Sequence, residues 1–98
     1  MKAREVVQGW LKEHQTQIGV EPSKWESSDL YAEKFIAWYE TDTHLIDICC
    51  WNNADCLDII ALNKNTKKED FMVAGECDGQ MGLSQRLREF LAWLKTTQ

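Results

Sequence analysis

Two apolar stretches joined by a short polar turn place the strongest constraint on the fold of this 98-residue chain. Residues 45–51 read Leu-Ile-Asp-Ile-Cys-Cys-Trp, residues 54–62 read Ala-Asp-Cys-Leu-Asp-Ile-Ile-Ala-Leu, and Asn52-Asn53 lies between them. Branched and aromatic side chains favour strands, and asparagine tolerates the positive φ of a tight hairpin turn. The pattern therefore predicts two antiparallel strands, Leu45–Trp51 and Ala54–Leu62, joined by a two-residue turn.

This turn length predicts the register and the two faces of the sheet. If Trp51 lies opposite Ala54, then Asp47 lies opposite Asp58, and alternate residues share a face. A preceding strand, Ala32–Glu40, joins the same sheet. The predicted core face carries Phe35, Ala37, Tyr39, Ile46, Ile48, Cys50, Leu57, Ile59 and Ala61. The opposite face is mixed, with Ile36, Trp38, Glu40, Leu45, Asp47, Cys49, Trp51, Cys56 and Asp58.

Two amphipathic patterns flank these strands. Apolar residues from Ala3 to Ile18 follow a helical period, and Gly19 and Pro22 should end that helix. A second helix is predicted from about Met81, with Asp78 or Ser84 as its N-cap and Arg86 on its outer side. Its apolar stripe consists of Leu83, Leu87, Phe90, Leu91 and Leu94. Phe71–Ala74 is expected to form a short fourth strand.

The expected architecture is therefore α+β. One domain, residues 1–98, contains an antiparallel four-stranded meander with N-terminal and C-terminal helices packed on one face (α-β-β-β-β-α). Such a sheet is buried on one side only, so the mixed face is predicted to be open.

The predicted strands lie in an acidic part of the chain. Between Glu26 and Asp58 eight carboxylates and one base, Lys34, leave a net charge of −7, whereas the whole chain carries −5. A field of one sign attracts a partner of opposite sign and speeds its capture. Facing carboxylates at Asp47 and Asp58 would repel each other unless water, a cation or a basic partner screens them. The sequence thus points first to recognition.

Composition argues against several classes of protein. A pI near 4.9 disfavours direct nucleic-acid binding, and no stretch approaches the roughly 18 apolar residues of a membrane-spanning helix. The first residues lack the apolar run of a secretion signal, so we expect a cytoplasmic protein with reduced thiols. The cysteines, which are expected to pack as small apolar residues, are Cys49, Cys50, Cys56 and Cys77. The sequence leaves open whether Cys49 and Cys56 form a disulfide.

Signals for an enzyme are weak. His14 and His44 lie far apart in sequence and lack the spacing of metal ligands. A thiol within an apolar strand has a raised pKa and poor access, and the chain has no glycine-rich phosphate loop. We predict no catalytic residue, no metal site and no cofactor. An acid–base pair at Asp47 and Asp58, or a cation at Asp55 and Asp58, is the weaker alternative.

The hairpin resembles a known family. Tyr39-Glu40-Thr41-Asp42, the strand that ends at Trp51, and the segment Asp55–Leu62 are similar to the corresponding parts of bacterial TriTu-type immunity proteins. These proteins accompany polymorphic and contact-dependent growth inhibition toxins. The resemblance implies a cytoplasmic protein that binds and blocks the C-terminal toxic domain of an effector, expected to be a nuclease-type toxin.

The charge pattern and the resemblance meet on the open face. Tryptophans supply desolvated contact area, and carboxylates supply orientation and on-rate. The predicted partner-binding residues are Trp38, Glu40, Asp47, Trp51 and Asp58. Two other interpretations remain: a homodimer or scaffold that uses this face as a subunit interface, and a small ligand-binding or cation-binding domain.

Overall fold

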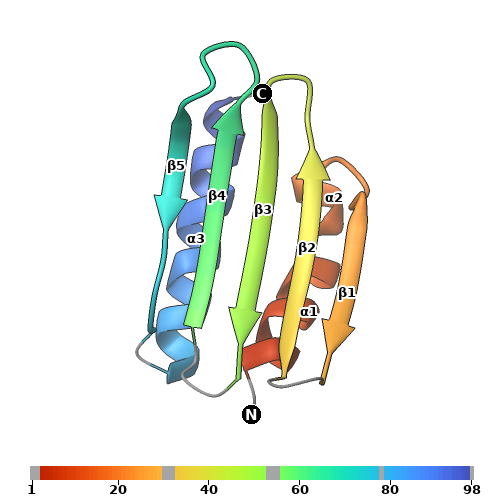
Figure 1. Ribbon diagram of the computed structural model, residues 1–98, viewed down its shortest axis with the longest axis vertical. Coiled ribbons are helices and arrows are strands. Elements are labelled where there is room, and N and C mark those ends of the chain that lie inside the picture. Colours follow the sequence, from red (N-terminus) through yellow and green to blue (C-terminus); the bar gives the residue numbers. More distant parts are fainter. Residues whose placement is uncertain (1–2, 30–32, 53–55, 78, 98) are drawn as a thin grey trace.

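The computed structural model describes residues 3–29, 33–52, 56–77 and 79–97, and these form an α+β fold (Figure 1). Its elements in chain order are α1 (Ala3–Glu13), α2 (Gln15–Ile18), β1 (Lys24–Ser28), β2 (Lys34–Glu40), β3 (His44–Trp51), β4 (Cys56–Asn63), β5 (Glu69–Val73) and α3 (Gly79–Thr96). The strands of this described part form one antiparallel sheet in the order β1-β2-β3-β4-β5. None of the described helices is both long and apolar enough to cross a membrane.

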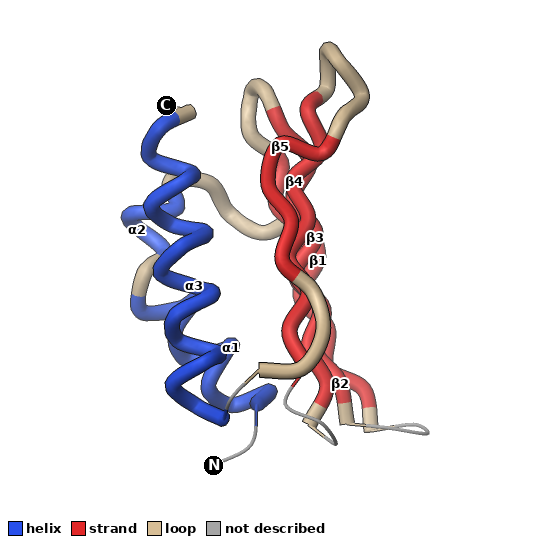
Figure 2. The backbone as a smooth tube through the Cα atoms, turned by 90° about the vertical axis from the view of Figure 1, so that its left-hand side faces the viewer, coloured by secondary structure: helices blue, strands red, loops and turns tan. Residues whose placement is uncertain are grey.

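The molecule has two layers, with all the described helices on one side of the sheet (Figure 2). The strand residues predicted to face the core are all buried, and Leu83, Leu87, Phe90 and Leu94 of α3 pack against them. Helix α1 contributes Ala3, Val6, Val7 and Leu11 to the same core. This arrangement confirms the prediction of helices on one face only. An antiparallel sheet can bury one side and expose the other.

The prediction of four strands is wrong, because a fifth strand, β1, precedes them. Its residues are mostly polar, so the local pattern did not suggest a strand. Pairing with β2 stabilises it, and Trp25 lies opposite Ala37 with its ring edge against Phe35 at 4.7 Å between centroids. Tertiary pairing outweighs weak β propensity here.

The predicted register of the central hairpin is also wrong, by two residues. Trp51 lies opposite Cys56, so Asp47 lies opposite Ile60 and Asp58 lies opposite Cys49. The predicted turn reaches residue 53, and residues 53–55 lie outside the described residues. Because strand side chains alternate with a period of two, this shift changes partners and leaves both faces intact.

The predicted helix limits are partly confirmed. The first predicted helix is divided into α1 and α2 at His14. The Nδ1 atom of His14 lies 2.8 Å from the carbonyl oxygen of Trp10. Gly19 ends α2 with a φ of 87°, as its place after the apolar stripe predicted. Ser84 lies inside α3 and is not its N-cap, while Asp78 lies outside the described residues.

Candidate functional site

The sheet face opposite the helices carries all the predicted partner-binding residues: Trp38, Glu40, Asp47, Trp51 and Asp58. Large apolar side chains remain accessible there. Trp38 is 43% exposed and Leu45 is 45% exposed. Lone exposed apolar residues are common, but a contiguous set marks a surface that can bind a partner.

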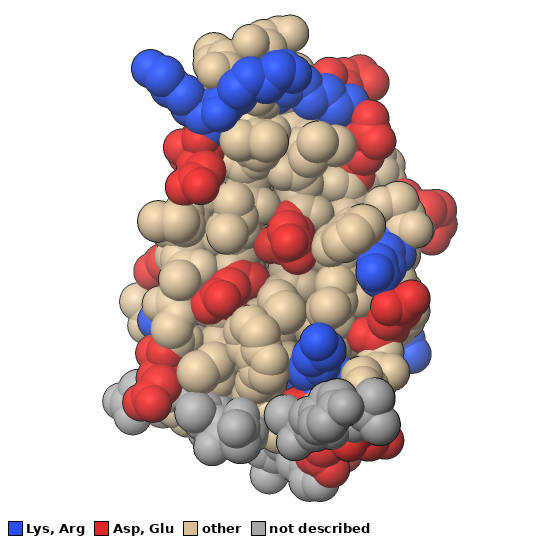
Figure 3. Space-filling view, viewed as in Figure 1, with Lys and Arg blue, Asp and Glu red and all other residues tan. Residues whose placement is uncertain are grey.

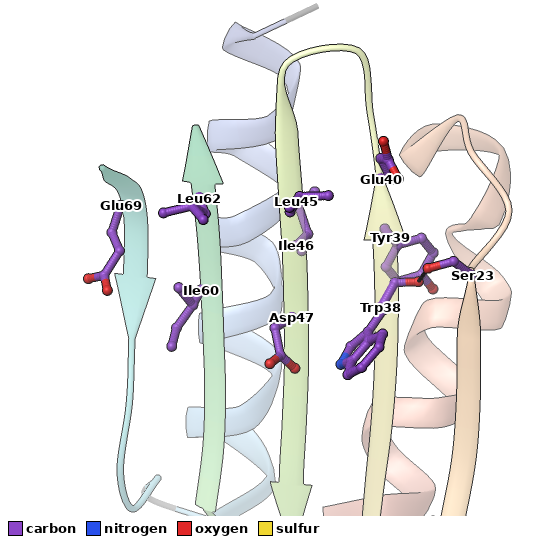
Figure 4. A pocket seen from close by; sticks show the side chains of 10 residues that line it. All are labelled: Ser23, Trp38, Tyr39, Glu40, Leu45, Ile46, Asp47, Ile60, Leu62 and Glu69. Carbon is purple, nitrogen blue, oxygen red and sulfur yellow. Dashed lines mark hydrogen bonds between the residues drawn. The ribbon is translucent and has the colours of Figure 1, made fainter. Parts of the chain in front are cut away.

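A groove of about 500 Å³ lies across β2, β3 and β4 on this face (Figure 4). Its lining residues are Ser23, Trp38, Tyr39, Glu40, Leu45, Ile46, Asp47, Ile60, Leu62 and Glu69. Three of the predicted site residues, Trp38, Glu40 and Asp47, therefore line one groove. Trp51 and Asp58 share the face but do not line the groove.

Sequence reasoning missed part of the groove wall. Ile60 and Leu62 alternate with the buried Ile59 and Ala61, so the strand period places them on the open face. They were not predicted as binding residues, because apolar residues in a strand usually belong to the core. Ser23 directly precedes β1, which was not predicted, and Glu69 begins β5, which was predicted to start only at Phe71. Only the strand order brings them near Trp38 and Asp47.

Glu40 is neutralised within the protein. Its Oε2 lies 2.6 Å from Nζ of Lys64, which follows β4. An exposed ion pair of this kind adds little stability, but it cancels the local charge. Glu40 is therefore not the free carboxylate that the sequence suggested.

Asp58 has a structural contact. Its Oδ1 accepts a hydrogen bond of 2.9 Å from the backbone N–H of Gly75, just beyond β5, and Leu57 N–H bonds the carbonyl of the same glycine. Gly75 has a φ of 91°, in the left-handed region that favours glycine. Asp58 thus holds the end of the β5 segment against β4.

Asp47, on the middle strand of the groove, makes no ion pair within the described part of the chain, and neither does Glu69 at the β5 edge. Partial burial raises its pKa above the ordinary value, while a side-chain hydrogen bond from Trp38 acts in the opposite direction. Asp58 raises the pKa further and Lys24 lowers it. Asp47 is thus an exposed residue whose charge is partly shielded from water, and Trp38 and Lys24 offset this effect only in part.

The acidity of residues 26–58 is spread more widely than the sequence indicated. Asp29 pairs with Arg4 of α1 at 2.6 Å, and Glu33 accepts a hydrogen bond from Asn52. Glu26 lies 3.5 Å from Lys24. Viewed from the open side, the sheet is mainly uncharged with separate acidic and basic side chains (Figure 3). The open face is thus mixed rather than uniformly acidic.

The strand thiols are held in the protonated form. Burial is the main cause that raises the pKa of Cys49 to about 11 and that of Cys50 to about 12. A thiol of this kind is a poor nucleophile at neutral pH. All four cysteines are free thiols, and the described residues contain no group of three acidic, histidine or cysteine side chains placed to hold a metal ion.

A second polar cluster lies at the far end of the central strands. The His44 side chain is 4% exposed, its Nε2 lies 2.8 Å from Oδ2 of Asp70, and its Nδ1 lies 2.7 Å from Oγ1 of Thr43. Trp93 of α3 meets the imidazole edge-on at 4.9 Å. This arrangement satisfies a buried histidine and ties β3 to β5 and α3.

Comparison with known proteins finds no matching family model, no matching characterised protein and no matching solved structure. A one-sided sheet with an apolar groove, an exposed tryptophan and a carboxylate beside it has the features of a binding surface.

Proposed function

We propose that this chain is a binding protein that uses the open face of its sheet to hold and neutralise a partner protein, as an immunity protein holds a toxin domain. One observation carries the proposal: the helices cover one side of the sheet, while the other side exposes a groove that contains Trp38 and Asp47 (Figures 2 and 4). Tryptophan is enriched among the residues that dominate binding at protein interfaces, and a carboxylate beside it can add charge complementarity.

The resemblance of the hairpin to TriTu-type immunity proteins suggests that the partner is a toxin domain. Toxin domains that act on nucleic acid present basic surfaces near their active sites, since they bind phosphates. A protein that covers such a surface excludes the substrate without any chemistry of its own. In this proposal the chain works in the cytoplasm, contacts no nucleic acid or membrane directly and needs no cofactor.

Growth rescue tests this function. The partner to use is the C-terminal domain of a large secreted protein encoded beside the gene for this chain. Expressed alone, that domain should stop bacterial growth, and co-expression of this chain should restore growth and yield a purified complex. Failure of both rescue and complex formation would refute the proposed function.

A charge-reversed variant tests whether the open face is the binding surface. Asp47→Lys should abolish rescue, whereas Asp42→Lys, the same change in the exposed β2–β3 turn, should not. Asp58→Lys is unsuitable for this purpose, because it also removes the hydrogen bond to Gly75. Rescue that survives Asp47→Lys would contradict the proposed surface.

A further inference from the structure

The groove on the open face places a chemical requirement on whatever covers it. Its walls are largely apolar, with Leu45 on β3 and Ile60 and Leu62 on β4, and Asp47 lies between Ile60 and Trp38 on the middle strand (Figure 4). A carboxylate that loses water without gaining a partner costs several kcal/mol. An occupant must therefore bring a donor or a positive charge to this point.

Three other acids of this face have partners of their own. Glu40 is paired with Lys64, Glu26 with Lys24, and Asp58 accepts the backbone N–H of Gly75. Asp47 makes no ion pair in the described ranges, and its hydrogen bond from Trp38 comes from a neutral donor. Among the described residues, the groove carboxylates without an ion pair are therefore Asp47 on the middle strand and Glu69 at the β5 edge. Asp47 is the one that lies between Trp38 and Ile60.

From this we infer that the groove receives a lysine or arginine side chain from a partner protein. The cationic group lies at Asp47, and the aliphatic stem lies along Trp38 and Ile60, the residues that face Asp47 from the neighbouring strands. The inference rests on the proposed function of the open face and specifies the chemistry of the partner at its centre.

The protein itself contains an example of this contact. Nζ of Lys24 lies 4.3 Å from the centroid of the Trp38 ring, so the indole already holds a cation on one side. Cations are attracted to the face of an indole, and long basic side chains bury their stems while keeping the charge near a partner. The combination of indole and carboxylate suits arginine especially, because its planar guanidinium can stack and bond at once.

A second copy of this chain is a poorer occupant. A two-fold axis through the groove centre would bring the two Asp47 carboxylates together in an apolar setting, where like charges repel strongly. A neutral apolar partner would leave Asp47 unpaired. Charge complementarity therefore favours a different protein with a basic residue amid apolar neighbours.

A displayed library of random peptides tests the inference and does not require the natural partner. Peptides selected on the intact protein should be enriched in arginine or lysine beside apolar residues. Their affinity should fall about tenfold or more on Asp47→Asn, since a hydrogen bond to a charged group is lost. Asp42→Asn, which makes the same change outside the groove, should leave the affinity within about twofold.

A Trp38→Ala variant, shown to be folded by circular dichroism, tests the binding surface separately from the basic-residue inference. Groove peptides should need both Trp38 and Asp47. Peptides that need Trp38 but tolerate Asp47→Asn would overturn the basic-residue inference and leave the binding surface standing. Failure to enrich any peptide sensitive to Trp38→Ala would overturn both. Self-association that Trp38→Ala abolishes, measured by sedimentation, would show a second copy as occupant and also overturn the inference.

Discussion

At the scale of single residues, the site contains a charge that does not serve the fold. Asp47 lies in the groove with a raised pKa caused mainly by burial, and no described base pairs with it. A group whose pKa is raised in the folded state destabilises that state when it is ionised. Proteins accept such a cost at positions that bind a partner.

Asp47→Asn should therefore increase the free energy of unfolding at pH 7. The asparagine oxygen can still accept the hydrogen bond from Trp38, while the desolvated charge is removed. The gain should shrink as the pH falls through the raised folded pKa and vanish below the ordinary value of 3.8, where Asp47 is protonated in both states. Urea unfolding of both proteins across this range measures the effect. A variant less stable at pH 7 would contradict it.

Tyr39 provides a test inside the core. Its hydroxyl is buried and has no hydrogen-bond partner among the described residues, and burial raises its pKa to about 12. Tyr39→Phe removes that hydroxyl and keeps the ring, so the free energy of unfolding should stay constant or rise by up to about 1 kcal/mol. A loss of more than about 1 kcal/mol in chemical denaturation would mean that the hydroxyl has a stabilising partner.

At the scale of elements, one arginine joins α3 to the end of the sheet. Arg86 donates from Nη1 to the carbonyls of Leu57 and Gly75, both at 2.9 Å, and from Nη2 to the carbonyl of Glu76 at 3.0 Å. The sequence placed Arg86 on the outer, solvated side of the helix, which is wrong. Helical period alone did not reveal that the chain after β5 returns beside this turn of α3.

Arg86→Ala should lower the free energy of unfolding by about 1–3 kcal/mol, because three carbonyls lose a charged donor. The amides of β5 should also exchange faster with deuterium. Arg88→Ala, two residues further along α3 at an exposed position, is the matched control and should change stability by less than about 0.5 kcal/mol. Equal losses of stability for the two variants would show that the hydrogen bonds of Arg86 do not stabilise the fold.

The central strands and both long helices were predictable because each buries one face with a regular period. Ile46, Ile48, Leu57 and Ile59 lie in the core, as their alternation indicated. β1 was not predictable in this way, since its stability comes from pairing with β2 rather than from its own residues. The register also depended on turn length, which two asparagines do not determine.

At the scale of the whole molecule, the two-layer arrangement makes the candidate site. Both long helices pack on one side, so the other side of the sheet keeps its groove. The sequence correctly placed all five predicted binding residues on that side. It could not show that Lys64 neutralises Glu40 or that Asp58 binds Gly75, because these contacts join segments distant in the chain.

The affinity of the proposed toxin partner for three forms of this protein tests the central claim most directly. We predict that Trp38→Ala weakens binding about tenfold or more relative to the unmodified protein, since Trp38 lines the groove. Met81→Ala, at a residue 83% exposed on α3, should leave binding unchanged. Calorimetry could instead show that Trp38→Ala leaves the affinity unchanged while Met81→Ala lowers it strongly. The helical side would then be the binding surface, and the account would be contradicted.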